Sequence, residues 1–301
     1  MFERTRHGYL TVLHFSFSSL AEYLDYLETA PVSRAFENAQ VSKQDYEEFT
    51  GSKSLEDAIA MCRYGYQDGF EEFFGLDAQI MRALDMSFDT VRTYNDYVGF
   101  APDVKAYLEG SPLTMINRPN PPRKSISVYM NTSYDAQTEI SQIFHRGAAV
   151  LTAMKVLEML RYSVDLHLFE MSYCDMGDST VEVHFSEFSL KNAGERTNVQ
   201  KLFFPLCHPS WIRRLNFRLI ETTPDISYQW AGTYGYPCSL HLMRKVLDLD
   251  ETSCVLVPSF DDLGVTGTDI VEDARKVFAV FNKVLPERDR LTLRAPIARG
   301  A

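Results

Sequence analysis

The clearest pattern of apolar and polar positions lies in the middle of the chain. Ser125 to Met130 is predicted to be a short strand, and a long helix with one apolar face is predicted from about Thr138 to Arg161. Apolar and polar residues then alternate over 164–169 and again over 181–186, which is the spacing of strands. Because Asp175-Met176-Gly177-Asp178 joins these two strands, they are predicted to pair as an antiparallel hairpin.

A further predicted strand, Cys254 to Val257, is a short apolar run typical of a strand buried in a parallel sheet. A helix with an apolar face follows from Asp269 to Leu285, and Pro286 comes after its end. The two apolar strands each precede a polar loop and a helix, so we expect them to be parallel neighbours in the sheet centre. The hairpin, from Tyr162 to Phe188, is expected at one edge of that sheet.

The N-terminal part of the chain has mainly helical patterns. Residues 8–17 are predicted to form a strand, Ser18 or Ser19 then caps a helix, and Ser54 caps another. A further helix is predicted over 70–86. We therefore expect a helical N-terminal lobe over 1–110, a proline-rich connector over 111–124, an α/β domain over 125–287 and a basic tail over 288–301.

Composition narrows the class of protein. The 301 residues are 45% hydrophobic and 24% charged, as in ordinary soluble globular proteins. A formal net charge of -11 repels the phosphate backbone and so disfavours nucleic-acid binding. The five cysteines are widely spaced without a C-x-x-C pair, which disfavours a cysteine-built zinc site and fits a reducing cytosol. We see no signal-peptide pattern and no apolar run of about 18 residues, so no membrane segment is expected.

Polar residues that follow the two apolar strands are candidate metal ligands. Asn131, Ser133 and Asp135 come after the first strand, and Asp261 and Asp262 come after the second. In an open α/β sheet, ligands bind beyond the carboxyl ends of the strands. Oxygen ligands of this kind suit a hard divalent cation such as Mg²⁺ or Mn²⁺. The competing interpretation is a polar strand-to-helix loop that holds no metal.

The order of strand, helix, hairpin, helices, strand and helix resembles a von Willebrand A-like domain, which is a Rossmann-like fold. That family carries D-x-S-x-S after its first strand and a further Asp after its fourth. Asn131 stands in place of the first Asp, Ser133 matches, and Asp135 replaces the second Ser. The resemblance implies a mostly parallel sheet with an antiparallel edge hairpin, and a metal site weakened by the loss of one carboxylate.

Two pairs of residues could carry other chemistry. Cys207 and His208 are adjacent, but a catalytic Cys–His pair needs a third group to orient the base, so a structural role for His208 is favoured. His167 and His184 could bind a metal only if the register of the two hairpin strands aligns them. A solvated face is favoured for these two histidines.

Two other segments are candidates for binding. Arg213, Arg214 and Arg218 could form an anion-binding edge, although solvation at the surface is favoured. Tyr234-Gly235-Tyr236-Pro237 is a turn whose rings could stack on a ligand or pack under a loop. The sequence contains no G-x-G-x-x-G, P-loop, G-x-S-x-G or H-E-x-x-H pattern, which argues against the commonest nucleotide enzymes and hydrolases.

Three segments look like parts of a family of uncharacterised proteins from tailed phages. They are Tyr94 to Pro102, Met115 to Arg118 and Phe204 to Arg214, and the similarity covers roughly Tyr46 to Pro237. The resemblance implies a phage-encoded protein that acts in the host cytoplasm. It offers no functional residues.

These features favour a non-enzymatic binding module that contacts a phage or host protein through the loops at the strand ends. The alternative is a metal-dependent enzyme that uses Ser133, Asp135, and Asp261 or Asp262. A third hypothesis is a nucleic-acid protein that uses residues 118–124 and the basic tail. The negative net charge makes it the weakest of the three.

Overall fold

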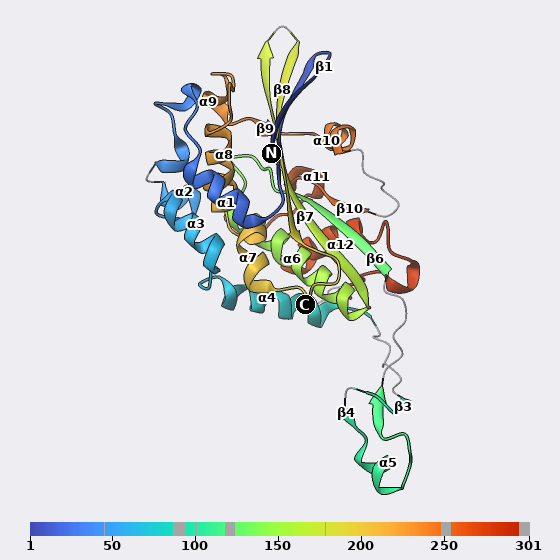
Figure 1. The fold of residues 1–301 in the computed structure, drawn as a ribbon. Coiled ribbons are helices and arrows are strands. Elements are labelled where there is room, and N and C mark those ends of the chain that lie inside the picture. Colours follow the sequence, from blue (N-terminus) through green and yellow to red (C-terminus); the bar gives the residue numbers. More distant parts are fainter. Residues whose placement is uncertain are drawn as a thin grey trace.

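The computed structural model describes residues 1–44, 46–86, 94–99, 101–117, 124–177, 179–247 and 254–294. Most of these residues form an α/β body in which helices cover a mixed, seven-stranded sheet (Figure 1). A small insert with a three-stranded sheet stands apart from this body. Its strands are β3 (Tyr94–Asp96), β4 (Ala101–Pro102) and β5 (Met115–Asn117).

The main sheet has the strand order β1-β2-β8-β7-β6-β10, and β9 pairs with β7. Its strands are β1 (Phe2–His7), β2 (Leu10–Phe17), β6 (Lys124–Asn131), β7 (Tyr162–Gly177), β8 (Thr180–Lys191), β9 (Tyr236–Pro237) and β10 (Cys254–Val257). Pairing is parallel between β10 and β6 and between β6 and β7, and antiparallel between β7 and β8. The predicted α/β class, the hairpin and the parallel neighbours β6 and β10 are therefore confirmed.

The position of the hairpin differs from the prediction. Strand β8 also pairs with β2, in parallel, so the hairpin lies inside the sheet instead of at its edge. Strand β10, expected in the centre, is the last strand on its side of the described sheet. The reason is an N-terminal hairpin of β1 and β2 that joins the sheet, with Leu10 opposite Val181. Pairing over such a long sequence separation leaves no local pattern to detect.

Strands β1 and β2 come from the segment expected to be a helical lobe, and they share one sheet with β6. The division into lobe, connector, α/β domain and tail stays a prediction. Parts of it lie outside the described residues: 118–123 of the expected connector and 295–301 of the expected tail. Asp178 of the expected hairpin turn also lies outside them.

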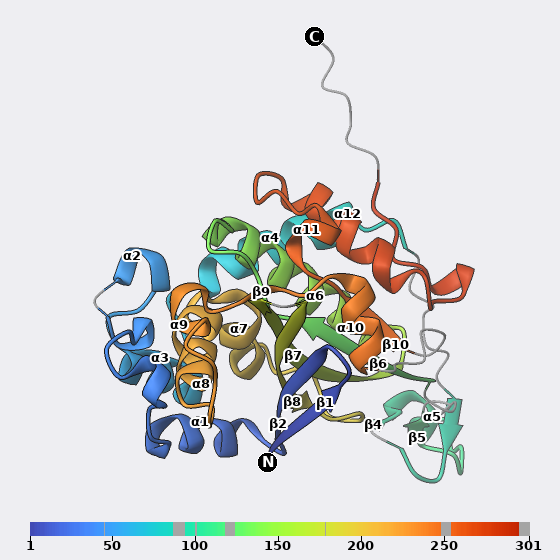
Figure 2. The same ribbon diagram turned by 90° about the horizontal axis from the view of Figure 1, so that it is seen from above.

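Helices cover the two faces of the sheet unequally (Figure 2). One face packs against α6, α7 and α12, with α1, α3 and α4 around them, whereas α10 covers part of the other face through Met243. The helices are α1 (Leu20–Thr29), α2 (Glu47–Thr50), α3 (Leu55–Tyr64), α4 (Phe70–Ala83), α5 (Val104–Leu108), α6 (Ile140–Met159), α7 (Val199–Cys207), α8 (Phe217–Glu221), α9 (Trp230–Thr233), α10 (Leu240–Leu247), α11 (Phe260–Leu263) and α12 (Ile270–Phe281). Shorter helical turns are η1 (Arg34–Phe36), η2 (Val41–Lys43), the π-helix η3 (Trp211–Asn216) and η4 (Glu287–Asp289).

Several helix starts follow the predicted local chemistry. The Ser19 hydroxyl accepts a hydrogen bond from the Glu22 N–H, and the Ser54 hydroxyl accepts one from the Asp57 N–H. These bonds satisfy backbone donors that a helix cannot pair internally at its first turn.

Within the described ranges, no helix combines the length and the apolar character needed to cross a bilayer.

Helix α6 lies under the sheet and meets α7 at very close range. A Cβ atom at Gly147 would lie 2.3 Å from the Leu206 carbonyl oxygen and 2.5 Å from the Cys207 sulfur. A backbone oxygen can move aside only if α7 moves with it. The close approach of α6 and α7 therefore requires glycine at position 147.

We expect Gly147→Ala to lower the free energy of unfolding by about 1–3 kcal/mol, because the added methyl group forces α6 and α7 apart. Gly75→Ala is the matched control, since its new Cβ would meet nothing within 4 Å on the exposed side of α4. That control should raise the stability by about 0.5–1 kcal/mol. Urea unfolding monitored by circular dichroism measures both, and equal stability of Gly147→Ala and the wild type would contradict the close packing.

Candidate functional site

The loop after β6 holds two of the predicted ligands in hydrogen bonds with the protein. The Asn131 Oδ1 atom accepts from the Ser133 N–H at 2.9 Å. The Ser133 hydroxyl donates to the Met171 carbonyl at 3.0 Å and accepts from the Met171 N–H at 2.7 Å. Both side chains are buried. These bonds tie the end of β6 to the neighbouring strand β7 and give the loop a fixed shape.

The predicted carboxylate ligands are exposed, and two of them, Asp135 and Asp262, line different cavities. Asp135 lines a cavity beside β7, whereas Asp262 lines a separate cavity beside β10. One Asp135 oxygen accepts from the Gln137 N–H at 2.7 Å, and one Asp262 oxygen accepts from the Ser259 hydroxyl at 3.0 Å. Asp261 is exposed on α11. The structure thus brings Ser133 and Asp135 to one cavity without Asp262.

An aromatic pair and a buried cation join the two loops. The Tyr134 and Phe260 rings meet edge to face, with centroids 5.6 Å apart. The Arg146 Cζ atom lies 3.7 Å from the centroid of Phe260, and its guanidinium donates to the Pro258 carbonyl at 3.1 Å. Burial lowers the pKa of Arg146 to about 9.

This arrangement does not favour a divalent ion between the loops. A guanidinium charge at this position would repel a second cation, and the nearby Asn131 and Ser133 oxygens already have partners. In the part of the chain that the structure describes, no group of three or more His, Cys, Asp or Glu side chains could hold a metal ion. The metal site stays a prediction.

The cavity that Asp135 lines has a volume of about 280 Å³. Its walls are residues 133–137, Glu170 and Ser172 of β7, parts of η3 and α8, and residues 233–237. It lies beside the end of β6, where a ligand is expected in an open α/β sheet. A π-helix such as η3 is also found frequently at functional sites. We take this strand-end cavity as the candidate functional site.

Glu170 is a buried carboxylate in the wall of the strand-end cavity. Its Oε2 lies 2.9 Å from Nδ1 of His184, whose Nε2 lies 3.2 Å from the Thr223 hydroxyl. The Thr223 hydroxyl donates its proton to the Leu219 carbonyl at 2.9 Å. Nδ1 of His184 thus faces a carboxylate and its Nε2 faces a hydroxyl, so both ring nitrogens have polar partners inside the protein.

His184 and His167 do not face each other. The register places His184 opposite Ser172 and His167 opposite Ser189. The expected solvated face is wrong for His184, which is completely buried and lies near the Trp230 ring. The alternation of polar residues along β8 indicated an exposed face, but the segment from α8 to α9 covers it. The sequence predicted the strand correctly, but it did not predict that the segment from α8 to α9 packs over this face of the strand.

The three arginines of η3 and α8 are buried, contrary to the solvated surface expected for them. Each of them donates to backbone carbonyls. The acceptors are Phe49 and Thr138 for Arg213, Ser42, Gln44 and Ser52 for Arg214, and Leu27 and Ala30 for Arg218. These bonds fix the N-terminal segments and the loop after β6 to one wall of the strand-end cavity. No sequence motif marks a carbonyl acceptor, which is why the pattern alone missed this role.

Cys207 and His208 lie at the end of α7, where they have structural environments. Burial raises the pKa of the Cys207 thiol and so disfavours the reactive thiolate. His208 caps α7, and its Nδ1 accepts from the Ser210 N–H at 3.2 Å. The structural role expected for His208 is confirmed. Burial also lowers the pKa of His208 to about 4, so its ring is neutral near pH 7.

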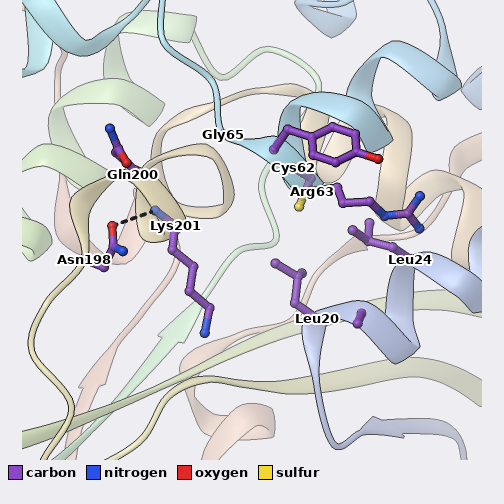
Figure 3. Close-up of a pocket in the computed structure, with 10 residues that line it drawn as sticks. Leu20, Leu24, Cys62, Arg63, Gly65, Asn198, Gln200 and Lys201 are labelled. Atoms are coloured by element: carbon purple, nitrogen blue, oxygen red, sulfur yellow. Dashed lines mark hydrogen bonds between the residues drawn. The ribbon is translucent and has the colours of Figure 1, made fainter.

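A wider hollow of about 370 Å³ lies between α1, the end of α3 and the start of α7 (Figure 3). Asn198 uses its side-chain oxygen to cap α7, and Arg63 donates to Asp25 and Glu28 at 3.0 Å. Because these polar groups already serve a cap and ion pairs, they carry no argument for a ligand. The strand-end cavity remains the better candidate.

Comparison with family profiles assigns the chain to a protein family. Residues 4–282 match a domain of unknown function, DUF7192. The chain belongs to this family. The DUF7192 match covers β2, the hairpin of β7 and β8, the insert and the strand-end cavity, so all of these are parts of the family domain. Searches of curated proteins and of solved structures found no match.

Calorimetry with Mg²⁺, Mn²⁺ and Ca²⁺ tests the metal prediction in this DUF7192 domain. We expect the wild type and Asp135→Ala to give the same result, because Arg146 opposes a cation and Asp262 lies at another cavity. Asp68→Ala is a control for the loss of an exposed carboxylate elsewhere. Heat that appears in the wild type and in Asp68→Ala but not in Asp135→Ala would establish the metal site.

Neutral His208 should make stability sensitive to acid. Between about pH 6.5 and pH 4 the unfolded chain binds a proton that folded His208 does not, so stability falls as pH falls through this window. The shift corresponds to about 3 kcal/mol. We expect this part of the loss to vanish in His208→Asn, which keeps an acceptor for Ser210, and to persist in the exposed control His241→Asn. Unfolding free energies across this pH range that fall equally in all three proteins would contradict the prediction.

Proposed function

We propose that this DUF7192 protein is a non-enzymatic binding module for a phage or host protein, and that the strand-end cavity receives a side chain of that partner. The observation that carries the proposal is a small cavity with fixed walls. At about 280 Å³ it lies at the lower limit of the range of about 300–1,000 Å³ that is usual for small-molecule pockets. That size suits one protruding side chain better than a cofactor.

The lining of the cavity supports a partner lysine or arginine. Asp135 and Glu170 supply carboxylates, while Ile212, Phe217 and Pro237 supply apolar surface. Long cationic side chains match such a lining, because their stems are apolar and their ends are charged. Binding rather than catalysis is supported by the hydrogen bonds that occupy the polar side chains of the loop after β6.

We further propose that β8, β7, β6 and β10, with α6 and α12, form a von Willebrand A-like core in a phage-encoded protein of the host cytoplasm. The support is topological: α6 follows β6, α12 follows β10, and the antiparallel β8 lies beyond β7. The positive charge of Arg146 argues against the metal-dependent alternative.

Affinity purification of the tagged full-length protein from infected cells, followed by mass spectrometry, identifies candidate partners. Each candidate is then purified, and its affinity is measured by calorimetry. Two variants probe the cavity: Asp135→Asn, which keeps an oxygen for the Gln137 N–H, and Tyr236→Ala, which removes a half-exposed ring from the rim. The control is Tyr228→Ala, whose ring is 71% exposed away from the cavity.

We expect Tyr236→Ala to weaken binding at least about tenfold, as for an aromatic contact residue. Asp135→Asn should weaken binding and flatten its dependence on salt, because it removes one charge of the proposed ion pair. Tyr228→Ala should bind as the wild type does. A partner that binds both cavity variants with unchanged affinity would refute the assignment of this cavity.

A further inference from the structure

The insert over residues 94–117 is a small folded unit. Its sheet has the order β3-β5-β4, and the Asp103 carboxylate caps α5 by accepting from the Ala106 N–H at 3.1 Å. The Asn95 side chain donates to Asp103 at 2.9 Å, and the Asp103 N–H donates to the Thr114 carbonyl at 2.7 Å. The unit therefore has a defined shape, although it stands away from the body of the protein in Figure 1.

The insert exposes its large apolar side chains. Of the fifteen large hydrophobic residues that are exposed among the described residues, six lie in this short segment, so the apolar surface is concentrated here. They are Tyr94, Tyr97, Val98, Val104, Tyr107 and Leu108. Such a concentration of exposed apolar side chains usually marks a site of protein interaction.

Helix α5 shows that this exposure follows a pattern. Val104, Tyr107 and Leu108 occupy positions i, i+3 and i+4, so they share one face of the helix. Their exposed fractions are 63%, 71% and 78%, whereas Ala106, on another face, is buried. An amphipathic helix normally turns its apolar face inward. In α5 the apolar face is turned to solvent, as expected for a surface that a partner covers.

Charge restricts what that partner can be. The described residues of the insert carry the carboxylates of Asp96, Asp103 and Glu109 and one lysine, Lys105, which lies 3.8 Å from Glu109. These groups sum to a charge of -2, from three acids and one lysine, which disfavours nucleic acid and anionic membranes as partners of this surface. A second copy is also disfavoured, because each chain has a net charge of -11 and the two inserts would repel each other. A basic protein surface is complementary.

We propose that the insert is a second docking surface, which binds a partner protein through an apolar hollow rimmed by lysine or arginine. Tyrosines suit this role, because a tyrosine ring buries a large apolar area while its hydroxyl bonds at the rim. The surface is separate from the strand-end cavity, so the two can be disabled independently.

The test uses full-length protein with Tyr97→Ser, Tyr107→Ser and Leu108→Ser combined. The matched control combines Tyr64→Ser and Tyr228→Ser, two tyrosines that are exposed outside the insert. Thermal unfolding should be the same for wild type, variant and control, since all of these side chains are exposed. Candidate partners captured from infected cells are purified singly, and direct binding is measured by calorimetry at low and high salt.

We expect at least one purified partner with a basic surface to bind the wild type and the control equally and the triple variant at least about tenfold more weakly. Its affinity should fall as the salt concentration rises. Equal binding of the triple variant, with loss only in Tyr236→Ala, would overturn the insert proposal and leave the strand-end proposal standing. Self-association through the insert in sedimentation runs, or no direct binding by any purified protein, would also overturn it.

Discussion

The guanidinium of Arg214 is completely buried, and it binds parts of the chain that lie far apart in the sequence. It donates to the carbonyl oxygens of Ser42, Gln44 and Ser52, which belong to η2 and to the chain between η2 and α3. Arg214 belongs to the π-helix η3, which contributes Ile212 and Asn216 to the lining of the strand-end cavity. Removing a buried cation from such a set of acceptors would leave several carbonyls unsatisfied, so the N-terminal segment and the cavity wall depend on this one side chain.

Two buried carboxylates add further links between the N-terminal region and the segment from α8 to Tyr234. Glu221 accepts from the hydroxyls of Ser42 and Tyr234, and burial raises its pKa above the usual range. Glu182 accepts from Arg4 at 2.6 Å and from the Trp230 indole at 2.9 Å. Each acid thus joins the segment that covers β7 and β8 to a different part of the N-terminal region. A polar network that is well paired specifies a single arrangement of its elements.

The two proposed binding surfaces differ in rigidity and in chemistry. The strand-end cavity is recessed, and hydrogen bonds between β6, β7 and η3 fix its walls. The insert instead presents an exposed helix face on a unit set apart from the body. A recessed pocket gives orientation and selectivity, whereas an exposed apolar face gives contact area. A partner that binds the cavity and the insert at the same time would bind more tightly than through either surface alone, because the two surfaces belong to one chain. This gain requires that the two contact points on the partner have the same spacing as the two surfaces.

Helix-capping residues and the spacing of apolar residues in the sequence determined where many helices and strands of this protein lie. Ser19 and Ser54 mark helix starts, and the apolar runs of β6 and β10 mark parallel neighbours, because caps and periodicity are properties of adjacent residues. The sequence also placed Ser133 and Asp135 at a strand end, where the candidate cavity lies.

Only the tertiary structure decided which elements meet. The pairing of β2 with β8 moved the hairpin into the sheet, and the covering segment buried His184 against Glu170. Arg213 and Arg214 look like surface residues in the sequence because arginine usually is exposed. Their burial depends on backbone carbonyls brought from more than a hundred residues away, and a carbonyl has no side-chain signature.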